Sequence, residues 1–289
     1  MSNPTRQHYI PRVYLKNFTN ENDKVWVYDK HEQSLKELST KDTTLEKNLY
    51  TITDTEGNKD FSIEKSFSEV ESATGPIISK VIKQETITLK EKAQLSLFIA
   101  LLENRTVLAL EENNKTSSEI LTWAKNMRLY NGDFDHIIEK MGCSREEAIE
   151  KIKNAKVSFN KATNLTTLID IANTIAQNYS MMEWRMFYAK NSNFLTSDNP
   201  LFLLPEKIDN NYGYGILTPG VNKIIPISSK TLLCIGDIGI IAVHGLNMGD
   251  KQRIRQLNIL TYLNAKRFVI ANNKGLIENI VKRVESKIL

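Results

Sequence analysis

Hydrophobic residues recur every three or four positions between residues 61 and 182, whereas the short segments on either side alternate between apolar and polar residues. A repeat near 3.6 residues predicts helices, and alternation bounded by Asn, Asp, Gly and Pro predicts strands. Because the helices gather in the middle of the chain, this order favours an α+β fold over repeated βαβ units. We predict one α+β domain over 1–289, with a β-rich part at 1–60, a helical part at 61–182 and a mixed part at 183–289.

Local signals place several element boundaries. The expected N-terminal strands are Lys24–Asp29, Leu35–Leu38 and Lys47–Ile52. Gly75 and Pro76 predict either two helices or one kinked helix in the first part of the helical region. Thr88 and Glu91 have the spacing of a capping box, so we expect one long helix to begin there and to continue through Arg105. The short β-like segments after residue 183 are expected to join the N-terminal ones in a small, mostly antiparallel sheet.

The composition indicates a folded globular protein, since 41% of the residues are hydrophobic and 25% are charged. No window is long and apolar enough to span a bilayer, and the first residues lack the apolar core of a signal peptide. We therefore expect a soluble, cytoplasmic protein that does not use a membrane. Cys143 and Cys234 lie far apart, which excludes a cysteine-built zinc site and argues against a disulfide framework. The sequence leaves the oligomeric state open.

Positive charge is concentrated near the C-terminus. The segment from Lys251 to the end holds nine basic and two acidic residues, a net charge of +7, whereas the whole chain has +4. A basic end suits a polyanion such as RNA or DNA, although lysine-rich surfaces also serve solubility alone. The predicted nucleic-acid contacts are Arg12, Lys16, Arg253, Arg255, Lys266 and Arg267.

The N-terminal run QHYIPRVYLKNF holds His8 among aromatic, basic and proline residues. A neutral imidazole can ligate a metal ion or act as a general base near pH 7. The alternative is that Tyr9, Ile10, Tyr14 and the phenylalanine that ends the run anchor this segment to the core. His8 would then only cap that contact.

Glu64 and Glu71 are seven residues apart, almost two helical turns, so both carboxylates are expected on one helix face. Such a pair can bind a divalent cation or share acid and base roles. Alternatively, the glutamates pair with Arg105, whose guanidinium lies in the apolar run LFIALLENRTVLAL and is costly to bury alone.

Asp198 stands in TSDNP, after a β-like segment, where the following Asn-Pro predicts the end of a strand. A carboxylate at a strand end is often presented to a cleft, and it builds an Asx turn equally often. Dinucleotide fingerprints, Walker loops, nucleophile elbows and HExxH zinc motifs are all missing from the sequence.

The run QHYIPRVYLKNF, Glu64 and Glu71, Arg105 in ENRT, TSDNP and the later IPIS segment resemble the motifs of the mostly bacterial DUF4238 family. The family carries no established reaction. The resemblance implies a bacterial cytoplasmic setting, and it implies that the separate polar motifs converge on one site. Val13 stands where the family has an aromatic residue, which concerns packing rather than chemistry.

Two hypotheses follow. In the first, the chain is a metal-dependent nuclease acting on RNA or DNA, as a bacterial toxin or phage-defence effector. Its predicted catalytic residues are His8, Glu64, Glu71, Arg105 and Asp198, and its predicted ligands for Mg²⁺ or Mn²⁺ are Glu64, Glu71 and Asp198. In the second, the chain is a non-catalytic sensor that binds nucleic acid or another ligand, and the same side chains form a structural network.

Overall fold

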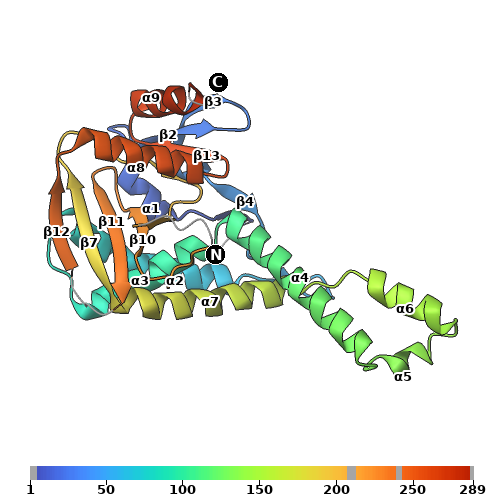
Figure 1. Cartoon of the computed structure of the whole chain (residues 1–289). Coiled ribbons are helices and arrows are strands. Elements are labelled where there is room, and N and C mark those ends of the chain that lie inside the picture. Colours follow the sequence, from blue (N-terminus) through green and yellow to red (C-terminus); the bar gives the residue numbers. More distant parts are fainter. Residues whose placement is uncertain (1–4, 207–212, 239–242, 287–289) are drawn as a thin grey trace. The chain divides into compact units, whose positions relative to one another are not determined.

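The computed structural model describes residues 5–206, 213–238 and 243–286 (Figure 1). By contacts the chain divides into two compact units: residues 1–106 with 169–289, here called the main unit, and Val107–Leu168, here called the helical unit. Helices and mostly antiparallel sheets make up the main unit, so the predicted α+β class is confirmed. The single domain over 1–289 stays a prediction.

Two sheets form the β-structure that positions the site. Among the described residues the larger has five strands in the order β12-β7-β11-β10-β9, and the smaller has four in the order β3-β2-β13-β8. Every neighbouring pair is antiparallel except β12 and β7. The larger sheet comprises β7 (Met182–Ala189), β9 (Phe202–Pro205), β10 (Val221–Pro226), β11 (Thr231–Ile238) and β12 (Val243–Met248). The smaller comprises β2 (Lys24–Asp29), β3 (Ser34–Ser39), β8 (Thr196–Ser197) and β13 (Phe268–Ala271).

Two short ladders complete the strands. They are β1 (Arg6–His8) with β4 (Leu45–Lys47), and β5 (Ile52–Thr53) with β6 (Lys59–Asp60). The smaller of the main sheets joins N-terminal strands to C-terminal ones, as expected from the sequence, because β13 pairs with β2 on one edge and with β8 on the other.

The helices of the main unit are α1 (Arg12–Leu15), α2 (Ser62–Ile82), α3 (Leu89–Asn104), α8 (Lys251–Asn264) and α9 (Lys274–Glu285). Those of the helical unit are α4 (Val107–Tyr130), α5 (Asp135–Ile138) and α6 (Arg145–Asn154), and α7 (Lys161–Met181) begins in the helical unit and ends in the main unit. One residue set of the larger sheet (Phe202, Ile224, Leu232 and Cys234) packs against Ile254 and Leu257 of α8.

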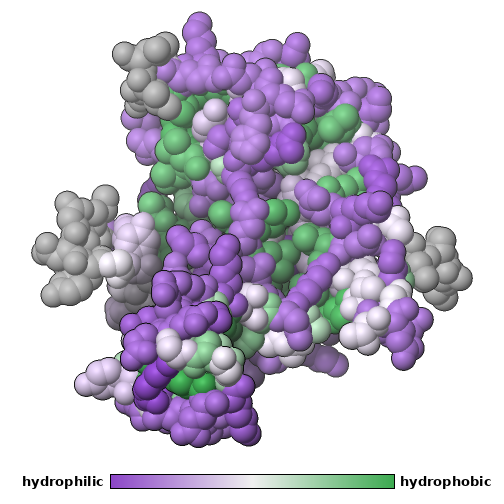
Figure 2. All heavy atoms as spheres, turned by 90° about the vertical axis from the view of Figure 1, so that its right-hand side faces the viewer, coloured by the Kyte–Doolittle hydropathy of each residue, from purple (hydrophilic) through white to green (hydrophobic). Residues whose placement is uncertain are grey.

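The surface view in Figure 2 is mostly hydrophilic, with hydrophobic residues visible between the polar ones. No single helix within the described ranges has both the length and the apolar character needed to cross a membrane. By length and composition alone, α3 and α4 would do so only as a pair.

Two local predictions differ from the structure, and a third is decided between its alternatives. The long helix predicted through Arg105 is wrong, because α3 ends at Asn104 and α4 begins at Val107. Of the two alternatives at Gly75 and Pro76, the structure has a single helix, α2. A Cβ atom on Gly75 would lie 3.2 Å from a methyl group of Val13, so glycine here allows α1 to approach α2 closely.

The second difference concerns Lys47–Ile52, which was expected to be one strand. Its ends pair with different partners, in β4 and β5, and Asn48 between them has a φ of 53°, which a strand does not accommodate. By contrast, β2 has the predicted bounds, and the capping box of Thr88 and Glu91 is present.

The run QHYIPRVYLKNF (Gln7–Phe18), here called the N-terminal motif, contributes several side chains to the core of the main unit. Tyr14, Leu15 and Phe18 are fully buried. The Tyr14 hydroxyl donates to the carbonyl oxygen of Pro226 at 2.6 Å and lies 2.7 Å from Oγ1 of Thr196, which consequently donates to it. One side chain of α1 thus joins β8 to the end of β10.

We expect Tyr14→Phe to lower the free energy of unfolding by about 1–3 kcal/mol, because it leaves a buried carbonyl and a buried hydroxyl without a partner. Urea denaturation followed by circular dichroism measures the change. Tyr130→Phe is the matched control, since Tyr130 is 88% exposed, and it should change the free energy by less than about 0.5 kcal/mol. Equal effects of the two variants would contradict this role of Tyr14.

Candidate functional site

The side chain of Arg105 forms hydrogen bonds with Glu71 and with the backbone of His8 and Tyr9. Its Nη1 donates to Oε1 of Glu71 at 2.9 Å, its Nη2 to the carbonyl oxygen of His8 at 2.9 Å, and its Nε to that of Tyr9 at 3.1 Å. The guanidinium carbon lies 4.9 Å from the ring centre of Phe67. The predicted Glu–Arg pairing is confirmed for Glu71.

These contacts explain why α3 ends where it does. Arg105 has left the helical region, with φ −96° and ψ 2°, and its backbone N–H still donates to Leu101. Its carbonyl oxygen accepts the Tyr50 hydroxyl at 2.6 Å. A buried guanidinium needs several acceptors, and ending the helix here gives it access to those of the N-terminal motif.

His8 and Glu64 lie beside Arg105 but differ in their bonding. The imidazole Nε2 of His8 is 3.2 Å from the carbonyl oxygen of Thr40, and burial lowers the pKa of His8. Oε2 of Glu64 is buried, and the described residues offer it no hydrogen-bond partner. Burial raises the pKa of Glu64, and the nearby Arg105 opposes that rise.

Asp198 supports the backbone of the smaller sheet. Its two carboxylate oxygens accept the backbone N–H groups of Lys266 at 3.0 Å and Arg267 at 2.8 Å, at the start of β13. Burial raises the pKa of Asp198, and these hydrogen bonds oppose the rise. Between the described atoms of Asp198 and Arg105 there is no hydrogen bond or ion pair, so hydrogen bonds join three of the five predicted catalytic residues, His8, Glu71 and Arg105, in one cluster.

The described residues contain no group of three or more His, Cys, Asp and Glu side chains placed to hold a metal ion. Glu71 and Asp198 direct carboxylate oxygens to Arg105 and to backbone N–H groups, respectively. A divalent cation bound by Glu64, Glu71 and Asp198 therefore stays a prediction.

The predicted nucleic-acid contacts differ in burial and pairing. Arg267 is ion-paired with Asp29 at 2.7 Å, and the half-buried Arg12 has its Nε buried. Lys16 and Arg253 are exposed, and Lys266 is half-buried. Arg255 lines a pocket. Binding of nucleic acid by this set of residues stays a prediction.

The pocket beside Arg255 has a volume of about 260 Å³ and lies between α8, α9 and the Ser192–Asn193 segment; we call it the α8–α9 pocket. Lys251, Arg255 and Arg283 bring three cationic groups to its lining, and no acidic residue lines it. Within the described part of the chain, none of these three side chains forms an ion pair. Such a pocket has the chemistry of an anion site.

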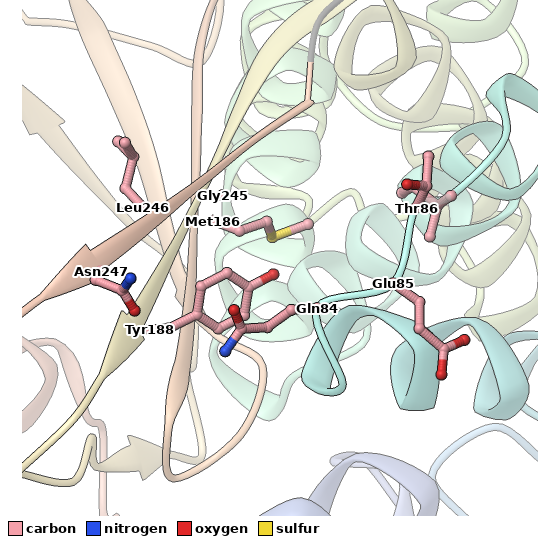
Figure 3. Close-up of a pocket in the computed structure, with 9 residues that line it drawn as sticks. Gln84, Glu85, Thr86, Met186, Tyr188, Gly245, Leu246 and Asn247 are labelled. Carbon is pink, nitrogen blue, oxygen red and sulfur yellow. The ribbon is translucent and has the colours of Figure 1, made fainter.

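A second pocket differs from the α8–α9 pocket because its lining includes Glu85 and no cationic residue. It has a volume of about 320 Å³ and is lined by the α2–α3 connection, β7 and β12. Figure 3 shows the Tyr188 ring between Asn247 and Gln84, with the Glu85 carboxyl group pointing away from the ring. The Tyr188 hydroxyl donates to the carbonyl oxygen of Val81 at 3.2 Å. Since no cation lines this pocket, it does not suit a phosphate.

A half-buried titratable group in the main unit, Glu103, escaped the sequence analysis. Glu103 of α3 accepts the hydroxyl of Tyr179 at 2.8 Å, and burial raises the pKa of Glu103 to about 7. Lys223 of β10 is 1% exposed and donates to two carbonyl groups, and burial lowers its pKa. Glu103 stands in the same apolar run as Arg105. Because a charged side chain in such a run is costly to bury, this position could have identified Glu103 from the sequence.

Comparison with known proteins gives a family but no reaction. A family model described as "Protein of unknown function (DUF4238)" matches residues 6–275. No curated protein and no solved structure matches the chain.

We expect Arg105→Met to lower the free energy of unfolding by about 3–5 kcal/mol, because it leaves Glu71 and two backbone carbonyl groups without their partner. Arg105→Lys should recover only part of this loss, since an ammonium group lacks the planar fork that reaches three acceptors. Urea denaturation is the measurement. The control is Arg145→Met, which breaks an exposed ion pair with Asp135 and should cost less than about 1 kcal/mol. A similar loss in both methionine variants would overturn the role of Arg105.

Glu103 should make stability fall as pH rises from about 5 to 8. The folded chain keeps the Glu103 proton up to about pH 7, whereas the unfolded chain loses it near pH 4.3. The folded state therefore binds more protons in this window, and raising the pH favours unfolding.

Glu103→Gln removes this titration, so the variant should gain on the wild type by on the order of 2–3 kcal/mol between pH 5 and pH 8. Denaturant midpoints at four pH values measure the change, and the exposed Glu69→Gln is the control. If the difference between Glu103→Gln and the wild type is constant with pH, the raised pKa is wrong.

Proposed function

Since this chain belongs to the DUF4238 family, whose reaction is unknown, we propose from its own geometry that it is a non-catalytic module that binds nucleic acid. The observation that carries the proposal is the α8–α9 pocket, where three cations from two helices line one concavity and no acidic residue is part of the lining. Phosphate groups supply most of the affinity in protein–nucleic acid complexes, and lysine and arginine are their usual partners.

The polar motifs of the family support a structural role in this proposal. Arg105 donates to Glu71 and to the backbone of the N-terminal motif, and Asp198 accepts from the backbone at β13. Groups whose hydrogen bonds are used inside the fold are costly to redirect toward a ligand. In this role, the hydrogen bonds of Arg105 and Asp198 would stabilise the part of the fold that supports α8 and α9. These two helices carry Lys251, Arg255 and Arg283.

A metal-dependent nuclease is the second candidate, as toxin or phage-defence effector. The observations that favour it are Glu103, whose pKa of about 7 suits a general acid or base, and the unpartnered buried oxygen of Glu64. In this function Mg²⁺ or Mn²⁺ would activate water and neutralise the scissile phosphate.

Binding is tested by fluorescence anisotropy with labelled single-stranded RNA and duplex DNA over a range of salt concentrations. Arg255→Gln with Arg283→Gln should weaken binding about tenfold or more and should reduce the salt slope by about 1.4–1.8, because two phosphate contacts are lost. The control pair is Arg253→Gln with Lys282→Gln, which removes the same charge from neighbouring exposed positions of α8 and α9 outside the pocket. Equal losses in the two double variants would show that general surface charge, not the pocket, binds the ligand.

The nuclease is tested by incubating labelled RNA and DNA with the protein and Mg²⁺ or Mn²⁺. Under the binding proposal the substrates stay intact at every metal concentration. Cleavage that disappears in Glu103→Gln, Glu71→Ala or Asp198→Ala, with melting temperatures that show a folded protein, would replace the binding module by the hydrolase.

A further inference from the structure

The shape of the α8–α9 pocket indicates which kind of phosphate group it binds. This inference rests on the proposed function. The pocket is a concavity of about 260 Å³, and its cations come from different elements: Lys251 and Arg255 from α8, and Arg283 from α9. A phosphate inside a strand reaches this half-open concavity with a nucleoside on each side, whereas a terminal phosphate reaches it with a nucleoside on one side only.

The charge of the pocket also favours a terminal phosphate over an internal phosphodiester. A phosphomonoester carries about −1.5 to −2 charges near pH 7, whereas a diester carries one. The described lining offers three cations and no carboxylate, and a fourth cation lies nearby, because the Lys230 ammonium donates to the carbonyl oxygen of Ser192 at 2.9 Å. An excess of unpaired positive charge gains most from a dianion with three terminal oxygens.

Asn193 supplies a neutral group beside these cations. Its Oδ1 atom is buried and has no hydrogen-bond partner among the described residues. The backbone of Asn193 is fixed, since Nδ2 of Asn258 donates to its carbonyl oxygen at 2.9 Å. A buried acceptor without a donor is costly. A fully ionised phosphate has no hydrogen to give it, but the hydroxyl of an attached sugar does.

We propose that the α8–α9 pocket binds a terminal phosphomonoester on a sugar, and that it selects this group over an internal phosphodiester. The ligand is the end of a nucleic-acid strand or a free mononucleotide, which share this chemistry. Lys251, Arg255 and Arg283 bind the phosphate oxygens, and Asn193 accepts a sugar hydroxyl.

The test compares the same 12-nucleotide RNA with a 5′-phosphate, with a 3′-phosphate and with hydroxyl groups at both ends, each carrying its label at the opposite end or internally. AMP and inorganic phosphate serve as competitors. We expect one phosphorylated end to bind about tenfold more tightly than the hydroxyl form, which corresponds to one added charge-assisted contact. AMP should compete at lower concentration than inorganic phosphate, because only AMP offers sugar hydroxyl groups to Asn193.

Matched variants locate the effect. Arg283→Gln should reduce the preference for the phosphorylated end to within about twofold, whereas Lys282→Gln on the same helix should keep it. Asn193→Asp adds a negative charge that repels either phosphate but keeps an acceptor for a sugar hydroxyl, so it should weaken binding of inorganic phosphate more than that of AMP. Equal losses for the two ligands would contradict the hydroxyl contact. Thermal melting checks that each variant is folded.

Equal binding of phosphorylated and hydroxyl-ended RNA, lost in Arg255→Gln with Arg283→Gln, would overturn the end selectivity while the nucleic-acid-binding function stands. Tight binding of AMP without binding of any RNA would support the phosphomonoester site and overturn the polymer as its ligand. If neither AMP nor any RNA binds, the proposed function and this inference both fail.

Discussion

The buried guanidinium of Arg105 is the interaction on which the main unit depends. With 5% of its side chain exposed, it must find acceptors inside the protein, and it takes them from α2 and from the N-terminal motif. The same need ends α3 at Asn104, because the residue that follows has to turn its side chain toward His8 and Tyr9. The aromatic rings of Tyr50 and Phe67 lie close to the guanidinium group of Arg105. One charge therefore fixes a helix end, a helix pair and the path of the N-terminus.

This arrangement separates groups that support the fold from groups that remain free for a ligand. Arg105 and Asp198 point inward and bind the backbone of the chain itself, so polar residues that sequence patterns make prominent are used as internal ties. Lys251, Arg255 and Arg283 of α8 and α9 have no such ties among the described residues and line a concavity. Internal polar ties make a sheet edge and its covering helices rigid, and a rigid frame loses less entropy when it binds a ligand.

The sequence contained part of this picture. The bounds of β2, the capping box at Thr88 and the pairing of Glu71 with Arg105 could be predicted, because each depends on neighbours along one strand or helix or on the cost of one buried charge. The break after α3 could not, since it depends on acceptors almost a hundred residues away. Glu103 and the α8–α9 pocket were missed for a similar reason: burial, and the convergence of α8 with α9, are properties of the assembled fold. Lys251 and Arg283 were visible only as members of a basic segment.

The hydroxyl group of Tyr14 reaches a carbonyl group 212 residues further along the chain. On a ribosome that adds about 5–20 residues per second, roughly 10–40 s pass before that partner is synthesised. Throughout this interval the apolar side chains of the first segment lack the strands that will cover them. The main unit therefore cannot complete the core around Tyr14 until most of the chain has been synthesised.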